Sequence, residues 1–362
     1  RARQGHTPIA RTMRHYDIKP LSDQALLQAQ GYIDRIAKPL GSMGRLEGLA
    51  ARLAAIQDTL RPELSPREHF VFAADHGIAE EDISKSPKEV TRQVVYSMLR
   101  GGAGICFLCR QHDFRLHLVD VGVDHDFGDE PGLIHRKLRH GTRSYLREAA
   151  MTQEEATKAL EIGERCVDEA LERGCRLLSF GEMGITNTSS SALWMYYLTD
   201  LPLEACVGRG SGLDDEGMQR KLAVLRTAVE RYSGTGDVWS VLCYFGGYEL
   251  VATVGAMLRA AERRTPFLVD GFIMTACVLM ARSFAPAVTD YAFYGHVGDE
   301  AGHARLLRYL DAQPILNLGL RLGEGTGAIC AFPILDSAAR MLREMASFTT
   351  SGVTDYIGVT EG

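Results

Sequence analysis

Glycines gather in three stretches of the sequence, and each stretch carries side chains that could bind or transfer a charged group. The densest stretch runs from Gly208 to Gly212, includes Arg209 and Ser211, and is followed by Lys221. Alternating glycines let consecutive backbone N–H groups converge on an anion, and a lysine adds a point charge. The stretch therefore predicts a phosphate site, with an ordinary surface loop as the alternative. It matches neither G-x-x-x-x-G-K-[ST] nor G-x-G-x-x-G, since Leu213 stands where the last glycine of the second motif belongs.

The second stretch, residues 181–190, follows an apolar run and carries hydroxyl or amide side chains from Thr186 to Ser190. We expect a helix to begin near Ser191. These side chains would then lie at a helix N-terminus, where backbone donors and the helix dipole favour an anion. Phosphate or carboxylate binding fits this pattern, and an N-cap with spare polar residues is the alternative.

The third stretch, residues 319–327, places Glu324 between two glycines just before the final predicted helix. Flanking glycines permit unusual backbone dihedrals and the close approach of a substrate. Packing explains a carboxylate at this position poorly, so Glu324 is a candidate for chemistry. The alternative is a helix-start acid that complements the helix dipole.

Histidines and cysteines carry less information. Cys106 and Cys109 have the spacing of half a zinc site, but no second C-x-x-C or H-x-x-x-H completes four ligands. We expect them, like the six dispersed cysteines, to be reduced core residues of a cytoplasmic protein. His76 is expected to be a hydrogen-bonded loop histidine, and no G-x-S-x-G elbow is present. The sequence thus predicts neither a metal nor a cofactor.

The elements that position these residues follow from the apolar periodicity. Four short apolar runs, each ending near a glycine and an acid, alternate with helical segments and cover residues 69–74, 116–119, 176–180 and 266–269. This alternation predicts an α/β fold, a parallel sheet with helices on both faces. Ligands bind such sheets beyond the carboxyl ends of the strands, so the acids and glycines there are the site candidates.

Both ends of the chain have helical periodicity, and a helix is expected at residues 328–348. We therefore predict a small helical domain built from the two termini, residues 21–65 and 328–362, beside a large α/β domain of residues 66–327 that holds the active site. Residues 1–20 are predicted to be an extension that need not be ordered.

Composition narrows the possible partners. The chain has 362 residues, 40 basic and 46 acidic, and a net charge of −6. That balance excludes the diffuse basic field that non-specific nucleic-acid binding requires. Apolar stretches stop short of the ~20 residues of a membrane span, so we expect neither nucleic acid nor membrane as a partner.

Six segments resemble, in the same order, motifs of the nicotinate-nucleotide:dimethylbenzimidazole phosphoribosyltransferase family. They are residues 38–47 (KPLGSMGRLE), 74–77 (ADHG), 86–91 (SPKEVT), 181–188 (GEMGITNT), 270–272 (DGF) and 321–327 (RLGEGTG). The resemblance runs from about Asp23 to Phe348. It implies transfer of phosphoribose from nicotinate mononucleotide to 5,6-dimethylbenzimidazole or a related aromatic base, which forms the α-ribazole phosphate of the cobamide lower ligand.

The resemblance also implies roles for individual residues. Glu324 resembles the family's catalytic base. The residues that resemble its base pocket are Ser86, Met183 and Leu322, and those that resemble its phosphoribosyl site are Gly184, Asn187, Gly208, Gly210 and Lys221. The chain departs from the family pattern at Gly295 and Gly298, where serine is commoner, and at Thr186, where glycine is commoner.

The chemistry implied by the resemblance agrees with the residues. Nicotinate leaves from a pyridinium and needs no general acid, whereas the incoming azole must lose its N–H proton. One carboxylate suffices, and an apolar pocket raises its pKa toward the working pH of a general base. Attack opposite the leaving group converts the β nucleotide into an α one.

Three alternatives remain open from the sequence. The acceptor could be a purine or a phenolic base, because an apolar pocket discriminates a methylene by only ~1–3 kcal/mol. An NAD-dependent dehydrogenase is the alternative of another class, although the dinucleotide fingerprint fails. A non-catalytic base-binding partner of an active paralogue is the third. We expect a cytoplasmic homodimer without a cofactor.

Overall fold

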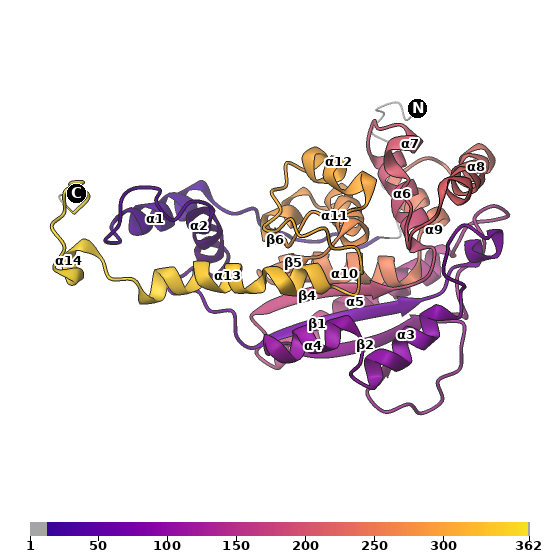
Figure 1. The fold of residues 1–362 in the computed structure, drawn as a ribbon, viewed down its shortest axis with the longest axis horizontal. Coiled ribbons are helices and arrows are strands. Elements are labelled where there is room, and N and C mark those ends of the chain that lie inside the picture. Colours follow the sequence, from indigo (N-terminus) through magenta and orange to yellow (C-terminus); the bar gives the residue numbers. More distant parts are fainter. Residues whose placement is uncertain (1–12, 361–362) are drawn as a thin grey trace.

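Six parallel strands form the central sheet of the structure, a computed structural model that describes residues 13–360 (Figure 1). The strands lie in the order β3-β2-β1-β4-β5-β6. Their bounds are β1 (Arg67–Ala74), β2 (Arg115–Gly122), β3 (Leu133–His135), β4 (Leu177–Met183), β5 (Phe267–Val269) and β6 (Ala292–Tyr294). From β1 the strands β2 and β3 extend the sheet in one direction, and from β4 the strands β5 and β6 extend it in the other. The junction between β1 and β4 is therefore the switch point at which α/β sheets bind ligands.

Helices cover both faces of this sheet, as the alternating pattern predicts (Figure 1). On one face, α10 (Tyr248–Glu262) packs on β1, β2 and β4 and is itself covered by α5 (Gln153–Glu172). On the other lie α3 (Val90–Leu99), α4 (Gly104–Gln111) and α13 (Thr326–Glu344). Burial on both faces explains why the strands are apolar runs rather than alternating ones.

The remaining helices surround the sheet and its ends. They are α1 (Asp23–Asp34), α2 (Arg45–Gln57), α6 (Asn187–Leu198), α7 (Leu203–Cys206), α8 (Asp215–Arg231), α9 (Val238–Phe245), α11 (Phe272–Phe284), α12 (Ala301–Tyr309) and α14 (Phe348–Ser351), with short 3₁₀ helices η1 (Gly77–Glu81) and η2 (Pro286–Tyr291). Within the described part of the chain, no helix is long and apolar enough to cross a bilayer.

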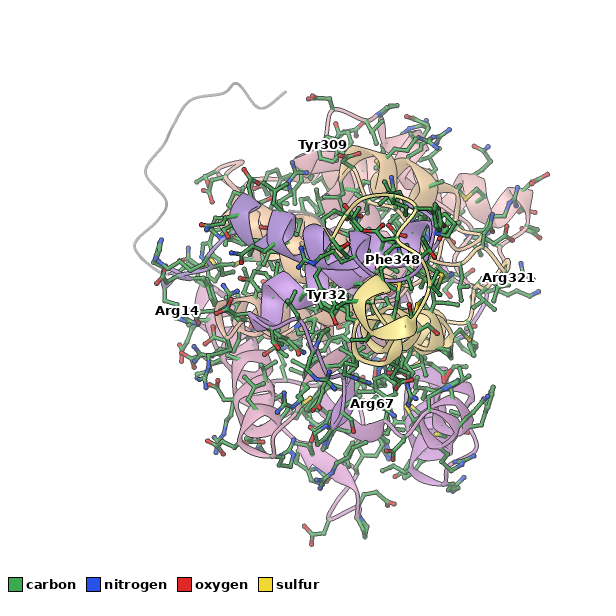
Figure 2. All side chains as sticks on the ribbon, turned by 90° about the vertical axis from the view of Figure 1, so that its left-hand side faces the viewer. Arg14, Tyr32, Arg67, Tyr309, Arg321 and Phe348 are labelled. Carbon is green, nitrogen blue, oxygen red and sulfur yellow. The ribbon has the colours of Figure 1, made fainter. Side chains whose placement is uncertain are left out.

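Two hydrophobic clusters make up the core. The larger surrounds the sheet, and the smaller joins α1, α2 and the second half of α13 through residues such as Ile33, Ala50 and Leu342. Figure 2 looks onto this small cluster, where the Tyr32 hydroxyl donates to the Leu342 carbonyl at 3.3 Å. Because the first half of α13 packs in the larger cluster, this helix belongs to both. The predicted domain boundaries stay a proposal.

Several boundaries differ from the sequence prediction. The strands β3 and β6 were not predicted, because three-residue edge strands carry too little periodicity. The last long helix runs over 326–344 rather than 328–348. Of the predicted extension, residues 1–12 lie outside the described residues, whereas Tyr16 and Ile18 are buried in the larger cluster.

Candidate active site

A cavity of about 190 Å³ lies at the carboxyl ends of β4 and β5, beside the switch point of the sheet. Its wall is formed by residues from six segments, 83–84, 182–188, 209–211, 270–274, 296–300 and 320–326, and by Lys221 of α8. Parts of all three glycine-rich stretches therefore meet here. Arg321 lines the cavity from an exposed loop, at the outer edge of the molecule in Figure 2.

Glu324 lies in this cavity with 6% of its surface exposed. Its backbone is left-handed, with φ of 65°, and its two neighbouring glycines also have positive φ. One carboxylate oxygen, Oε1, accepts a hydrogen bond from the backbone N–H of Ile105 at 3.3 Å. Burial raises the pKa of Glu324, the bond from Ile105 opposes that shift, and the charge of Asp270 adds to it. A carboxyl with a raised pKa in a cavity has the properties of a general base.

A second carboxyl, that of Glu182, comes from the end of β4. Burial raises its pKa to about 8, an effect that its hydrogen bond with Asn187 opposes and that the nearby carboxylates reinforce. The Asn187 side-chain amide donates to Oε2 of Glu182 at 2.5 Å. At neutral pH Glu182 is therefore mainly protonated and can donate a hydrogen bond rather than accept a proton. The residue was not among the predicted site residues, although its place after a buried strand was the available signal.

Two of the three predicted base-pocket residues line the cavity. Met183 ends β4, and Leu322 lies on the far wall with 62% of its surface exposed. Ser86 does not line it. This residue lies instead in an adjoining cavity of about 140 Å³. Its backbone N–H donates to the Ser84 hydroxyl at 3.2 Å. Ser84 lines both cavities, so Ser84 rather than Ser86 lines the cavity that holds Glu324.

Four of the five predicted phosphoribosyl residues line the cavity: Gly184, Asn187, Gly210 and Lys221. Lys221 is fully buried, and its ammonium donates to Thr188 Oγ1 at 3.0 Å and to the Gly208 carbonyl at 2.8 Å. Burial lowers the pKa of Lys221 to about 8, although the charge of Glu300 opposes the shift. A cation held beneath a glycine-rich loop is suited to bind a phosphate.

Gly208, the fifth predicted phosphoribosyl residue, does not line the cavity. Its carbonyl accepts from Lys221, and the Glu300 carboxyl is packed so closely that a Cβ on Gly208 would overlap it. Glu300 itself lines the cavity and was not predicted from the sequence. Gly208 therefore positions the lysine and leaves room for Glu300.

The helix after the second glycine-rich stretch begins at Asn187, not near Ser191 as predicted. Asn187 and Thr188 consequently occupy its first turn and face the cavity, together with the preceding Thr186. Ser189 and Ser190 are fully buried and do not line the cavity. An anion in the cavity would therefore meet only some of the five polar side chains, because a helical turn presents only some of its side chains to one side.

Thr186 is an unusual residue at this helix start. Its φ of 79° is in the left-handed region, its hydroxyl caps nothing, and that buried hydroxyl has no partner in the structure. A β-branched residue in this conformation is strained, which gives a physical reason for the glycine that the family more often has there.

The other two departures concern glycines. Gly298 lines the cavity, whereas Gly295 lies behind it. A Cβ on Gly295 would come within 2.8 Å of both the Ala328 Cα and the Gly327 carbonyl oxygen. The close approach of α13 to β6 therefore requires glycine at position 295 in this chain.

The predicted structural histidine and cysteines lie outside the cavity. His76 is buried, with Nε2 2.5 Å from Glu249 Oε1. Cys106 and Cys109 are buried on α4. Among residues 13–360, no three His, Cys, Asp or Glu side chains form a cluster that could hold a metal ion.

A parallel sheet with a cavity at its switch point, a buried lysine under a glycine loop and a carboxyl with a raised pKa define an enzyme that handles a phosphorylated substrate. A family model described as phosphoribosyltransferase matches residues 18–353. The chain therefore belongs to this family, which rules out the dehydrogenase alternative.

Individual relatives agree with that assignment. The chain is 55% identical over 328 residues to the nicotinate-nucleotide–dimethylbenzimidazole phosphoribosyltransferase of Parabacteroides distasonis, covering 90% of this chain and 95% of the relative. It is 47% identical to the protein of the same name from Dechloromonas aromatica, covering 90% and 94%. The crystal structure of CobT from Thermus thermophilus superposes with a TM-score of 0.88 at 42% identity, covering 92% of this chain and 99% of that one.

Proposed function

We propose that this enzyme transfers phosphoribose from nicotinate mononucleotide to 5,6-dimethylbenzimidazole or a related base. The proposal follows the names of the relatives, and one observation of the structure carries it: a buried carboxyl and a buried lysine line a single cavity. Lys221, with the Gly210 loop, is placed to bind the phosphate. Glu324 is placed to receive the proton of the acceptor base.

The reaction balances with these two groups. The bond between the ribose carbon and the pyridinium nitrogen breaks, and its electron pair neutralises that nitrogen. The azole ring nitrogen that carries no hydrogen forms the new bond from the opposite side, which inverts the anomeric centre. The N–H proton of the other ring nitrogen passes to the Glu324 carboxylate. Nicotinate leaves without a general acid, because its ring nitrogen takes up the electron pair of the broken bond.

Five further residues assist in this proposal. Met183 and Leu322 provide apolar contacts for the aromatic ring, and Asn187 with Gly184 lies on the phosphoribosyl side. Protonated Glu182 donates a hydrogen bond to the substrate. Ser86 would contact the base only if the base extends into the adjoining cavity, whose shared wall is formed by Ser84 and Thr186.

The test is incubation of the purified protein with nicotinate mononucleotide and a panel of azoles, purines and phenols, followed by mass identification of the products. We expect the α-riboside phosphate of dimethylbenzimidazole and release of nicotinate. Turnover of a purine or phenol in preference to the azoles would change the acceptor, and no nicotinate release with any base would refute the activity.

We also propose that the enzyme is a cytoplasmic homodimer. Large apolar side chains are exposed at the small helical cluster and the following segment, notably Leu27 at 72% and Tyr356 at 64%, and exposed apolar groups of this kind favour association. All eight cysteines are free, which suits a reducing compartment. Light scattering with size-exclusion chromatography tests the dimer, and a monomer across the micromolar range would contradict it.

A further inference from the structure

Glu324 is held in a backbone conformation that is unfavourable for a residue with a side chain. Its φ is 65°, between Gly323 at 90° and Gly325 at 94°, and the two glycines adopt positive φ without strain. A non-glycine residue keeps such a conformation only where the surrounding structure fixes it. The contacts that fix this loop come from the carboxyl end of β5 and from the middle of β1.

Asp270, directly after β5, accepts three backbone N–H groups from the start of α13. Its Oδ2 accepts from Gly325 at 3.1 Å, and its Oδ1 accepts from Gly327 at 2.8 Å and Ala328 at 3.3 Å. The first N–H groups of a helix have no partner within it, and the N-cap of α13 is a glycine without a side chain. A carboxylate 55 residues away in sequence therefore supplies the cap that the helix lacks.

Asp270 stays ionised in this position. It is buried, and burial works to raise its pKa, but hydrogen bonds from His296 and from the backbone of Gly325 and Gly327 hold the pKa below its usual value. The carboxylate is thus a fixed negative charge beside Glu324.

His69 holds the same loop from β1. Its Nε2 lies 2.9 Å from the Glu324 carbonyl oxygen, and because a carbonyl only accepts, Nε2 carries the proton. Burial lowers the pKa of His69 to about 4, so the ring is neutral at working pH. Cβ atoms at Gly325 and Gly327 would overlap the rings of His69 and His296 respectively. The His69 and His296 rings therefore pack directly against the backbone of Gly325 and Gly327 and restrict movement of this loop.

We propose that Asp270 and His69 are positioning residues of the transfer reaction, which hold the Glu324 carboxyl in the geometry and charge state of a general base. Neither needs to touch the substrate. The titratable groups around Glu324 and its loop are Glu182 on β4, Asp270 after β5, Cys106 on α4, His69 on β1, which contacts the Glu324 carbonyl, and His296 after β6, which contacts Asp270. Of these groups, Asp270 is the carboxylate that contacts the loop and is held in its ionised form.

The main test is Asp270→Asn. The asparagine amide keeps the shape of the Asp270 side chain, and its oxygen can still accept the hydrogen bond from Gly327. Its NH₂ group, however, faces the N–H of Gly325 and cannot accept from it, and the negative charge of the carboxylate is lost. We expect kcat to fall about 10²-fold, as for a misplaced catalytic group. Since the Asp270 charge raises the pKa of Glu324, its loss should also move the acid limb of the kcat/KM profile to lower pH.

A matched control is Asp120→Asn. Asp120 lies near the end of β2 and also accepts two backbone N–H groups, from Gly122 at 3.1 Å and Val123 at 2.9 Å, but it is outside the cavity. This variant should lose stability without a shift of the acid limb.

The contact from His69 is tested by two variants. His69→Phe removes the donor to the Glu324 carbonyl and should lose turnover, whereas the amide of His69→Gln can donate to that carbonyl and should recover part of the loss.

This inference rests on the proposed function only for the turnover measurements. A second measurement needs no substrate: the pKa of Glu324 from the carboxyl ¹³C resonance of glutamate-labelled protein, assigned by its loss in Glu324→Gln. Asp270→Asn should lower that pKa and Asp120→Asn should not. An unchanged pKa and acid limb in Asp270→Asn would overturn the positioning role, whereas wild-type protein without turnover would refute the function alone.

Discussion

Two buried carboxyls and one buried ammonium determine the chemistry at the scale of single residues. Burial raises the pKa of Glu182 to about 8, so this carboxyl is mainly neutral at pH 7 and acts as a hydrogen-bond donor. Burial also raises the pKa of Glu324, and each carboxyl accepts one hydrogen bond that favours its charged form. We assign the base of the proposed reaction to Glu324, which lines the cavity between two glycines.

Replacing Glu324 by glutamine should keep binding of both substrates and remove most of the turnover. The amide retains the shape of the side chain but cannot accept the azole proton, and general-base catalysis contributes typically ~10²–10⁴-fold. The measurement is steady-state kinetics near neutral pH, with substrate binding followed by calorimetry. Turnover close to that of the wild type would remove Glu324 from the role.

The pH dependence of kcat/KM for the mononucleotide should be bell-shaped. On the acid side activity falls as Glu324 becomes protonated, at a pH above that of an ordinary carboxyl because its pKa is raised. On the alkaline side the Lys221 ammonium, with a pKa of about 8, loses its proton and with it the attraction for phosphate. Glu182, the proposed hydrogen-bond donor, also has a pKa of about 8 and loses its proton over the same range. The comparison is therefore the double variant Lys221→Met/Glu182→Gln, which should have a higher KM for the mononucleotide and no alkaline limb near pH 8. An identical alkaline limb in that variant would assign it to another group.

At the scale of elements, the site depends on two helix starts that their own sequences support poorly. The helix α6 begins after a threonine in the left-handed region, and α13 begins after a left-handed glycine with no capping side chain. Both helices begin beside the cavity. At α13 the Asp270 carboxylate already accepts the N–H groups of Gly325, Gly327 and Ala328. The start of α6 is therefore the one of the two where the helix dipole and backbone N–H groups favour an anionic ligand. Local stability is thus reduced where the ligand is expected to bind.

Thr186→Gly should stabilise the folded protein by about 0.5–1 kcal/mol. Relief of the strain of a β-branched residue at φ of 79° exceeds the entropy that glycine adds to the unfolded chain. Thr152→Gly is the opposite control, because Thr152 has φ of −75° and caps α5 through Glu155, so its loss costs a few tenths of a kcal/mol. Urea unfolding measures both, and a destabilised Thr186→Gly would show that its buried hydroxyl contributes to the fold.

At the scale of the molecule, Arg52 on α2 joins the small helical cluster to the sheet. Its Nη2 donates to the carbonyls of Asp290 at 3.0 Å and Ala292 at 2.7 Å, and its guanidinium carbon lies 4.2 Å from the centroid of the Phe293 ring. These partners lie in η2 and β6, so one side chain connects the two hydrophobic clusters.

Arg52→Met should lower the free energy of unfolding by about 2–3 kcal/mol, because hydrogen bonds from a charged donor contribute ~1.5–3 kcal/mol and buried carbonyls lose their partner. The cavity residues do not contact Arg52, so kcat at 25 °C should change little. Arg45→Met is the control: Arg45 also joins α2 to a carbonyl, at 2.7 Å from Pro314, but that contact is exposed. Equal losses in both variants would show that burial at Arg52 has no special effect.

The sequence by itself determined the class of fold and most of the candidate site. The four longer strands are apolar runs because both faces of the sheet are buried, and this pattern is local. The three glycine-rich stretches were recognisable for the same reason, and they led to Glu324, Gly210 and Lys221. The family resemblance added Met183 and Gly184, and all five residues line the cavity.

Only the tertiary structure decided which neighbours give these residues their properties. Asp270 caps a helix that begins 55 residues later, Ser84 rather than Ser86 reaches the main cavity, and Gly208 lies behind Lys221. These relations depend on how distant loops meet at one edge of the sheet, and no periodicity encodes that meeting. The raised and lowered pKa values follow from the same cause, because burial and neighbouring charges exist only after the chain has folded.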